Sequence, residues 1–75
     1  MPSLPVVSGR EAGKALAKLG FVYDHHSGSH MIHYHPDGRH LSIPNHRELD
    51  RGLLRKLIRH AGITVEEFVK LLRDP

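Results

Sequence analysis

The sequence predicts a small α+β domain of two layers, with its elements in the order α-β-β-β-α-α. Three observations support this prediction. Helix-start signals stand near both ends of the chain, at Ser8 and at Thr64. Between them, two short segments that alternate apolar and polar residues flank Asp37-Gly38, a dipeptide typical of tight hairpins. At 75 residues the chain has room for one domain, so these elements share a single thin core.

Charge and composition narrow the classes of protein and partner. The net charge is +3 with neutral histidines, which points to a polyanion or an acidic protein as the partner. No apolar run approaches the roughly 20 residues of a membrane span, and the first five residues show no signal peptide. The absence of cysteine excludes disulfides and suits the reducing cytoplasm. We therefore expect a cytoplasmic protein without a membrane partner, with one domain over residues 1–75 and a tail at residues 1–7.

The first helix has clear start and stop signals. Ser8 and Glu11 have the spacing of a capping box, in which each side chain accepts a hydrogen bond from the other residue's backbone. Gly20 stands where a left-handed residue would end the helix. Between them, apolar residues fall on one helical face, at Ala12, Ala15, Leu16 and Leu19.

Residues 21–24, 29–35 and 39–43 are expected to form three antiparallel strands, with Pro44 ending the third. We expect Asp37-Gly38 to be a two-residue loop, which places Tyr34 opposite Leu41 and Ile32 opposite Ile43. In that register the apolar residues share one side, which helices would cover. The side toward the helices then carries Ile32, Tyr34, Leu41 and Ile43, and the other side carries His33, His35, His40 and Ser42.

Two further helices follow a loop at residues 45–49. Asp50 is the expected N-cap of the first of them, and Gly62 ends it. Thr64 and Glu67 form a second capping box, which starts a helix that runs to about Arg73. With helices on one face of a three-stranded antiparallel sheet, this arrangement resembles the double-stranded-RNA-binding fold. A fold alone does not give a function.

Gly28-Ser29-His30 is the segment that could carry chemistry, because His30 follows a tight turn at the start of a strand. The expected register puts His30 toward the helix side, Asn45 opposite His30, and His46 opposite Ser29. Histidine exchanges a proton near neutral pH, so a half-exposed one at this place could serve proton transfer. From spacing alone, a His30 that merely borders the core and bonds a backbone group is the simpler interpretation.

Several segments in a fixed order resemble one family. These are Gly28-Ser29-His30-Met31-Ile32, Pro36-Asp37-Gly38-Arg39, Ile43-Pro44-Asn45-His46 and residues 52–62. Together they resemble the HicA toxins, also described as YcfA-like proteins, from about residue 8 to residue 70. The resemblance implies an mRNA interferase with a double-stranded-RNA-binding-like fold, neutralised by a HicB antitoxin, whose catalytic histidine matches His30. The family does not require the extra histidines, to which we assign no role: His25, His26, His33, His35 and His40.

The implied chemistry suits so small a site. RNA carries its own nucleophile, the 2′-hydroxyl, so an enzyme need only orient it, take its proton and stabilise the charged phosphate. One histidine can act as the base, with neither a metal nor a cofactor. The same mechanism would spare DNA, which lacks the 2′-hydroxyl.

Arg51, Arg55 and Arg59 lie four residues apart and form a stripe beside the apolar face of the second helix, next to Lys56. Arginine suits phosphate because its planar group bonds two oxygens at once. A solvated helix face is the alternative. Repulsion between the like charges, of a few tenths of a kcal/mol per pair, favours an anionic partner.

Two other classes of function compete with the nuclease. A zinc site on the open face at His33, His35 and His40 is conceivable, although these residues include no carboxylate or thiolate. A module that binds structured RNA without cutting it also fits the fold, but double-stranded-RNA binders span about 16 base pairs with several surfaces. One basic stripe on 75 residues is small for that task.

Overall fold

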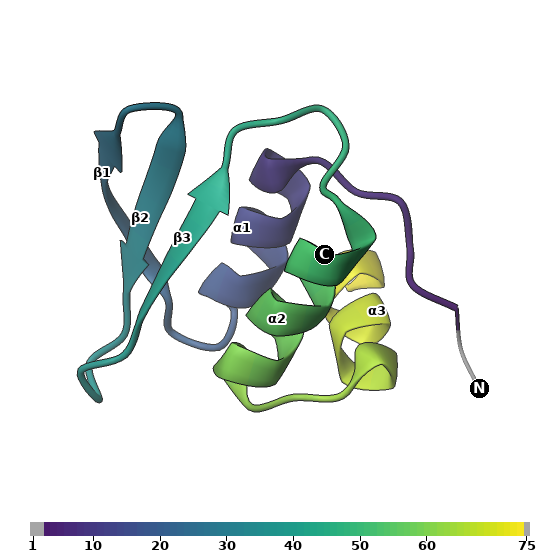
Figure 1. Cartoon of the computed structure of the whole chain (residues 1–75). Helices are drawn as coiled ribbons and strands as arrows, with labels where there is room; N and C mark the ends of the chain where they lie inside the picture. The colour runs from purple at the N-terminus through teal and green to yellow at the C-terminus, as the bar shows by residue number, and fades with distance from the viewer. Residues whose placement is uncertain (1–2, 75) are drawn as a thin grey trace.

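The computed structural model describes residues 3–74 and has two layers, a three-stranded sheet and a layer of helices (Figure 1). The helices α1 and α2 lie against the sheet, and α3 packs on both of them away from it. The elements are α1 (Gly9–Ala17), β1 (Val22–Ser27), β2 (His30–Tyr34), β3 (His40–Pro44), α2 (Arg51–Ala61) and α3 (Val65–Arg73). The strands are antiparallel in the order β1-β2-β3. The predicted α+β class and the helices on one face are confirmed.

The helix ends follow the local signals in the sequence. At α1, the Ser8 hydroxyl accepts from the Glu11 amide at 3.0 Å, and the Glu11 carboxylate accepts from the Ser8 amide at 2.9 Å. The matching pair at α3 is Thr64 with Glu67. The Asp50 side chain caps α2 through the Leu53 amide. Capping depends on residues three apart, so tertiary structure has little influence on it.

The loop between β2 and β3 differs from the prediction. The His35 amide donates to the Arg39 carbonyl at 2.9 Å, and the Gly38 amide donates to the His35 carbonyl at 3.0 Å. These bonds close a three-residue loop over residues 36–38, in which Gly38 has a φ of 96°. A type I turn followed by a left-handed glycine is the usual form of such a loop. The Asp37 carboxylate stabilises it by accepting from the amide and the Nε of Arg39.

The longer loop shifts the register by one residue, so that Tyr34 lies opposite His40 and Ile32 opposite Ser42. A shift of one residue turns every side chain to the other face. The side toward the helices therefore carries Met31, His33, Leu41 and Ile43, all buried. The side without helices, called the open face below, carries Val22, His25, Ser27, His30, Ile32, Tyr34, His40 and Ser42. The predicted assignment of the two faces is wrong.

The core lies between this sheet and the helices, and its largest fully buried side chains are Phe21, Phe68, Leu16, Ile43 and Leu54. The first strand begins after Phe21 and is longer than expected, and the β1–β2 turn is at Gly28 and Ser29. The expected tail includes Leu4 and Val7, which are buried in the core, while its residues 1 and 2 lie outside the described part of the chain. Within residues 3–74, no helix is long and apolar enough to cross a membrane.

Candidate functional site

His30 is the first residue of β2 and lies on the open face, opposite Ser27 on one side and Pro44 on the other. The sequence placed it on the helix side, and the register shift corrects this. Its side chain is exposed and makes no hydrogen bond with the residues described. Backbone pairing on both sides fixes its position while both ring nitrogens stay free for a ligand.

The turn before His30 depends on Gly28, which has a φ of 61°. A Cβ at this position would have open space around it, so the backbone conformation and not crowding favours glycine. The turn reverses the chain so that Ser27 and His30 end the β1–β2 ladder as a pair. His30 is thereby presented at the end of the hairpin and away from the core.

Asn45 and His46 lie at the same end of the sheet as His30, one position from the places expected. The Asn45 amide donates to the Ser29 carbonyl at 2.9 Å, so Asn45 pairs with Ser29 and not with His30. The His46 carbonyl accepts from the Gly9 amide, which ties this loop to the start of α1. Both side chains are exposed. The predicted gathering of these residues at one end of the sheet agrees with the structure, and the predicted pairing is wrong by one residue.

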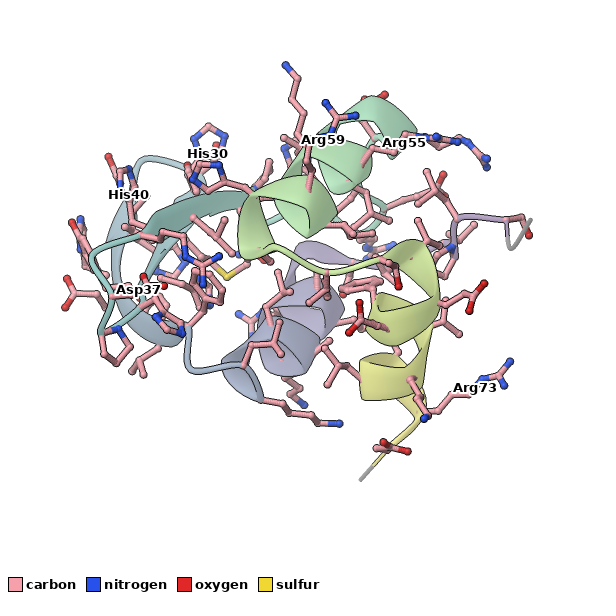
Figure 2. The ribbon with its side chains drawn as sticks, turned by 90° about the horizontal axis from the view of Figure 1, so that it is seen from below. His30, Asp37, His40, Arg55, Arg59 and Arg73 are labelled. Atoms are coloured by element: carbon pink, nitrogen blue, oxygen red, sulfur yellow. The ribbon has the colours of Figure 1, made fainter. Side chains whose placement is uncertain are left out.

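The predicted basic residues of α2 are all exposed: Arg51, Arg55, Lys56 and Arg59. No carboxylate among residues 3–74 forms an ion pair with them. In Figure 2, His30, Arg59 and Arg55 lie toward the same side of the molecule, with Arg73 near the opposite side. Arg55 and Arg59 of the stripe thus lie toward the same side of the molecule as His30.

A groove of about 220 Å³ joins the sheet to α2. Its polar side chains are His40 and Ser42 from the open face and Lys56 and His60 from α2, and Leu41 and Leu57 form the rest. We call it the β3–α2 groove. It brings a cationic side chain of α2 beside the edge of the open face.

A second groove, of about 450 Å³, lies on the helix side of the sheet between α1 and the β1–β2 hairpin. Arg10 and Lys14 of α1 line it together with Tyr23, His26 and the buried His33. It is the larger of the two, but its sheet residues point to the face opposite His30. It does not belong to the site around His30.

The three histidines considered for zinc do not share a face. His33 is buried against α1, and burial lowers its pKa. The Nε2 of His35 bonds the Leu19 carbonyl at 2.9 Å, on the same side of the sheet. His40 lies on the open face instead. Within residues 3–74, no group of three or more histidine and acidic side chains is arranged to hold a metal ion.

The sequence reasoning missed a row of three rings across the open face. His25 of β1, Tyr34 of β2 and His40 of β3 are cross-strand neighbours, with ring centroids 6.4 Å and 5.9 Å apart. We call these residues the ring row. The expected register put Tyr34 in the core and therefore hid the row. A three-residue loop, also compatible with Asp37-Gly38, would have revealed it.

The sequence matches one known protein family over most of its length. The model of the HicA toxin of bacterial toxin-antitoxin systems matches residues 9–63 of the 75. The chain belongs to the HicA toxin family. The match runs from the first residue of α1 past the end of α2, so it includes His30, the ring row and the basic residues. This HicA chain is thus the toxin of a toxin-antitoxin pair, which implies an antitoxin partner. A search of curated proteins gave no match.

Proposed function

We propose that this HicA toxin is a metal-independent endoribonuclease that cleaves mRNA, with His30 as its general base. The observation that carries the proposal is the placement of His30. It is an exposed histidine, fixed by backbone pairing, whose side chain makes no hydrogen bond with residues 3–74. A base needs such a free nitrogen within reach of the proton that it takes. Gly28 and Ser29 form the turn that precedes it. Asn45, whose amide bonds the Ser29 carbonyl, and the next residue, His46, are the proposed neighbours of the site.

The reaction proposed is a transfer within the RNA strand. The Nε2 or Nδ1 of His30 takes the proton of a 2′-hydroxyl, and the oxygen attacks the adjacent phosphorus. The bond from phosphorus to the 5′-oxygen breaks, which leaves a 2′,3′-cyclic phosphate on one fragment and, after protonation, a 5′-hydroxyl on the other. No electrons are exchanged, and the RNA supplies the nucleophile, so the chain's own task is to orient and to move a proton.

The basic residues of α2 support RNA as the substrate. Four exposed cationic side chains of α2, which no described carboxylate pairs with, are Arg51, Arg55, Lys56 and Arg59. Of these, Arg55 and Arg59 lie toward the same side of the molecule as His30 (Figure 2). Arginines on one helix face can bind successive phosphates and hold the strand while its 2′-hydroxyl meets the base. Because mRNA is the proposed substrate, we place the toxin's action in the cytoplasm, where a HicB-type antitoxin would restrain it.

A non-catalytic RNA-binding module is the second candidate. One observation favours it: no side chain among residues 3–74 is hydrogen-bonded to His30, so no partner orients the ring before RNA binds. Such a module would use the same basic surface to hold RNA and would leave the strand intact.

Purified toxin incubated with RNA in EDTA separates these functions. We expect cleavage in EDTA by the native protein, and a loss of roughly 10²–10⁴-fold in His30→Ala, which is typical for removal of a general base. His26→Ala is the matched control, because His26 is also exposed on the hairpin but belongs to the helix side. Binding without cleavage by the native protein would support the module, and activity that EDTA abolishes would support a metal enzyme.

A further inference from the structure

The ring row lies on a part of the sheet that no helix covers. Tyr34 is 46% exposed, so its side chain is open to a ligand, and its ring makes interplanar angles of 26° with His25 and 38° with His40. The Nδ1 of His25 lies 2.6 Å from the carboxylate of Asp24, so this acidic side chain is hydrogen-bonded to a member of the row. Three exposed rings from three strands thus gather on the open face.

His40 connects this surface to a cationic one. It ends the ring row and also lines the β3–α2 groove beside Lys56 and His60. Proteins hold single-stranded nucleic acid by two features together, aromatic rings on which bases stack and a cationic groove that follows the backbone. In such proteins the rings bind bases, and the cationic groove binds the backbone phosphates.

The ring row is also close to the proposed base. His30 and Tyr34 lie on the same face of β2, four residues apart. At about 3.3 Å per residue along a strand, their backbones are roughly 13 Å apart. A strand of a few nucleotides can therefore contact Tyr34 while another of its nucleotides lies at His30.

We infer that the open face is a platform for single-stranded RNA, with one unpaired base stacked on Tyr34 between His25 and His40 and its phosphate directed toward Lys56. This inference deepens the proposed function, because it names the form of RNA and the residue that positions it. Bases inside a duplex are already stacked on their neighbours and present only their edges. A row of exposed rings therefore favours unpaired strands over the duplexes that the fold class would suggest.

Binding of a short RNA with 2′-O-methyl groups at every position tests the inference. Such RNA lacks the free 2′-hydroxyl and cannot be cut, so the measurement does not depend on whether His30 is a base. We expect Tyr34→Ala to weaken binding roughly 5- to 100-fold, as loss of one stacked base does elsewhere. Tyr34→Phe keeps the ring and should bind like the native protein. A perfect duplex of the same sequence should bind more weakly than the single strand.

Tyr23 provides a matched control. It is 49% exposed, nearly as much as Tyr34, but lies on the opposite side of the same hairpin. Tyr23→Ala should leave binding unchanged. NMR signals of the tyrosine rings in the native protein give a second measurement that needs no variant, since the chain has two tyrosines and no tryptophan. Only the Tyr34 ring should shift when the RNA is added.

Three results would overturn the inference. They are equal losses in Tyr34→Ala and Tyr23→Ala, tighter binding of the duplex, and a Tyr34 ring that does not shift on binding. Cleavage of ordinary RNA is measured separately. If cleavage fails while the platform binds, only the nuclease proposal is lost, and if the platform fails while cleavage persists, only the stacking inference is lost.

Discussion

The ring of His33 lies against Gly13 of α1, so closely that a Cβ on Gly13 would come within 3.1 Å of the Nε2 atom. His33 is 5% exposed, and its Nδ1 has no hydrogen-bond partner among the residues described. Burial lowers the pKa of His33 below its ordinary value of 6.5, and the nearby Met31 backbone opposes this only in part. Arg10 and Lys14, which line the same groove, add no compensating negative charge. This side chain is therefore a polar group held in the core at a cost.

The first prediction is that His33 makes the fold sensitive to acid. Below pH 6.5 the unfolded chain binds a proton at this residue more readily than the folded chain does, so stability falls as the pH drops toward the lowered pKa. His33→Leu removes both the titrating group and the unpartnered nitrogen. At pH 7 we expect this variant to have the same free energy of unfolding as the native protein, or one up to about 1 kcal/mol higher.

Urea unfolding at pH 7 and pH 5 measures the effect. The free energy of unfolding should decline more steeply for the native protein than for His33→Leu, since the other histidines are common to both and cancel in the comparison. Parallel declines would show that His33 does not contribute to the acid sensitivity.

The second prediction concerns the contact between α1 and the end of β3. A Cβ on Gly9 would come 2.0 Å from the Pro44 carbonyl oxygen, a backbone atom that cannot turn aside. Gly9→Ala should therefore destabilise the fold by roughly 1–3 kcal/mol, because the helix must shift from the sheet. A Cβ on the exposed Gly52 of α2 would have the end of the Asp50 side chain as its nearest atom, and this side chain can move. Gly52→Ala should be near neutral or favourable by about 0.5–1 kcal/mol, and similar losses in both variants would contradict this explanation.

The local elements could be predicted from the sequence, and the register could not. Ser8 and Thr64 determine helix starts through residues three positions away, so their geometry is independent of the rest of the fold. Asp37-Gly38 suits both a two-residue loop and the end of a three-residue loop. The composition of β2 does not show which of its faces packs in the core, because each face carries an apolar residue, Met31 on one and Ile32 on the other. The three-residue loop sets the register in the structure, and it turns Met31 and His33 toward α1, a helix distant in sequence from the loop.

The site was predictable to the same extent. The stripe at Arg55 and Arg59 follows from helical periodicity alone, and the structure keeps it exposed. The face of His30 depended on the register and was therefore placed on the wrong side. The ring row required pairings between three strands, which no single segment encodes.

The third prediction concerns the arginine stripe. Arg55→Ala combined with Arg59→Ala should weaken RNA binding and flatten its dependence on salt, because fewer counterions are released. For single strands, each lost phosphate contact lowers the slope of log affinity against log salt by about 0.7. The control removes two exposed cations from α3, with Lys70→Ala and Arg73→Ala. Fluorescence anisotropy over a range of salt concentrations gives both slopes, and an unchanged slope in the first variant would leave the stripe a solvated helix face.

The last prediction concerns the antitoxin that family membership implies. A toxin whose proposed base is exposed on an open sheet face can be silenced by covering that face, without a conformational change in so small a domain. An acidic antitoxin surface would be attracted by the net charge of +3, so salt should slow its association. We expect the antitoxin to bury His30 and the arginine stripe together, and therefore to compete with RNA for one surface.

Chemical modification of histidines, read by mass spectrometry, tests this directly. His30 and His40 lie on the open face, whereas His26 is exposed on the helix side of the same hairpin. In the complex, His30 and His40 should lose reactivity, and His26 should keep it. RNA that displaces the antitoxin can itself cover the imidazole of His30, so histidine reactivity does not report displacement. Competition between uncleavable RNA and the antitoxin is therefore measured separately, by fluorescence anisotropy. Protection of His26 with His30 still reactive would place the antitoxin on the α1 side, and inhibition would then have to act at a distance from the proposed base.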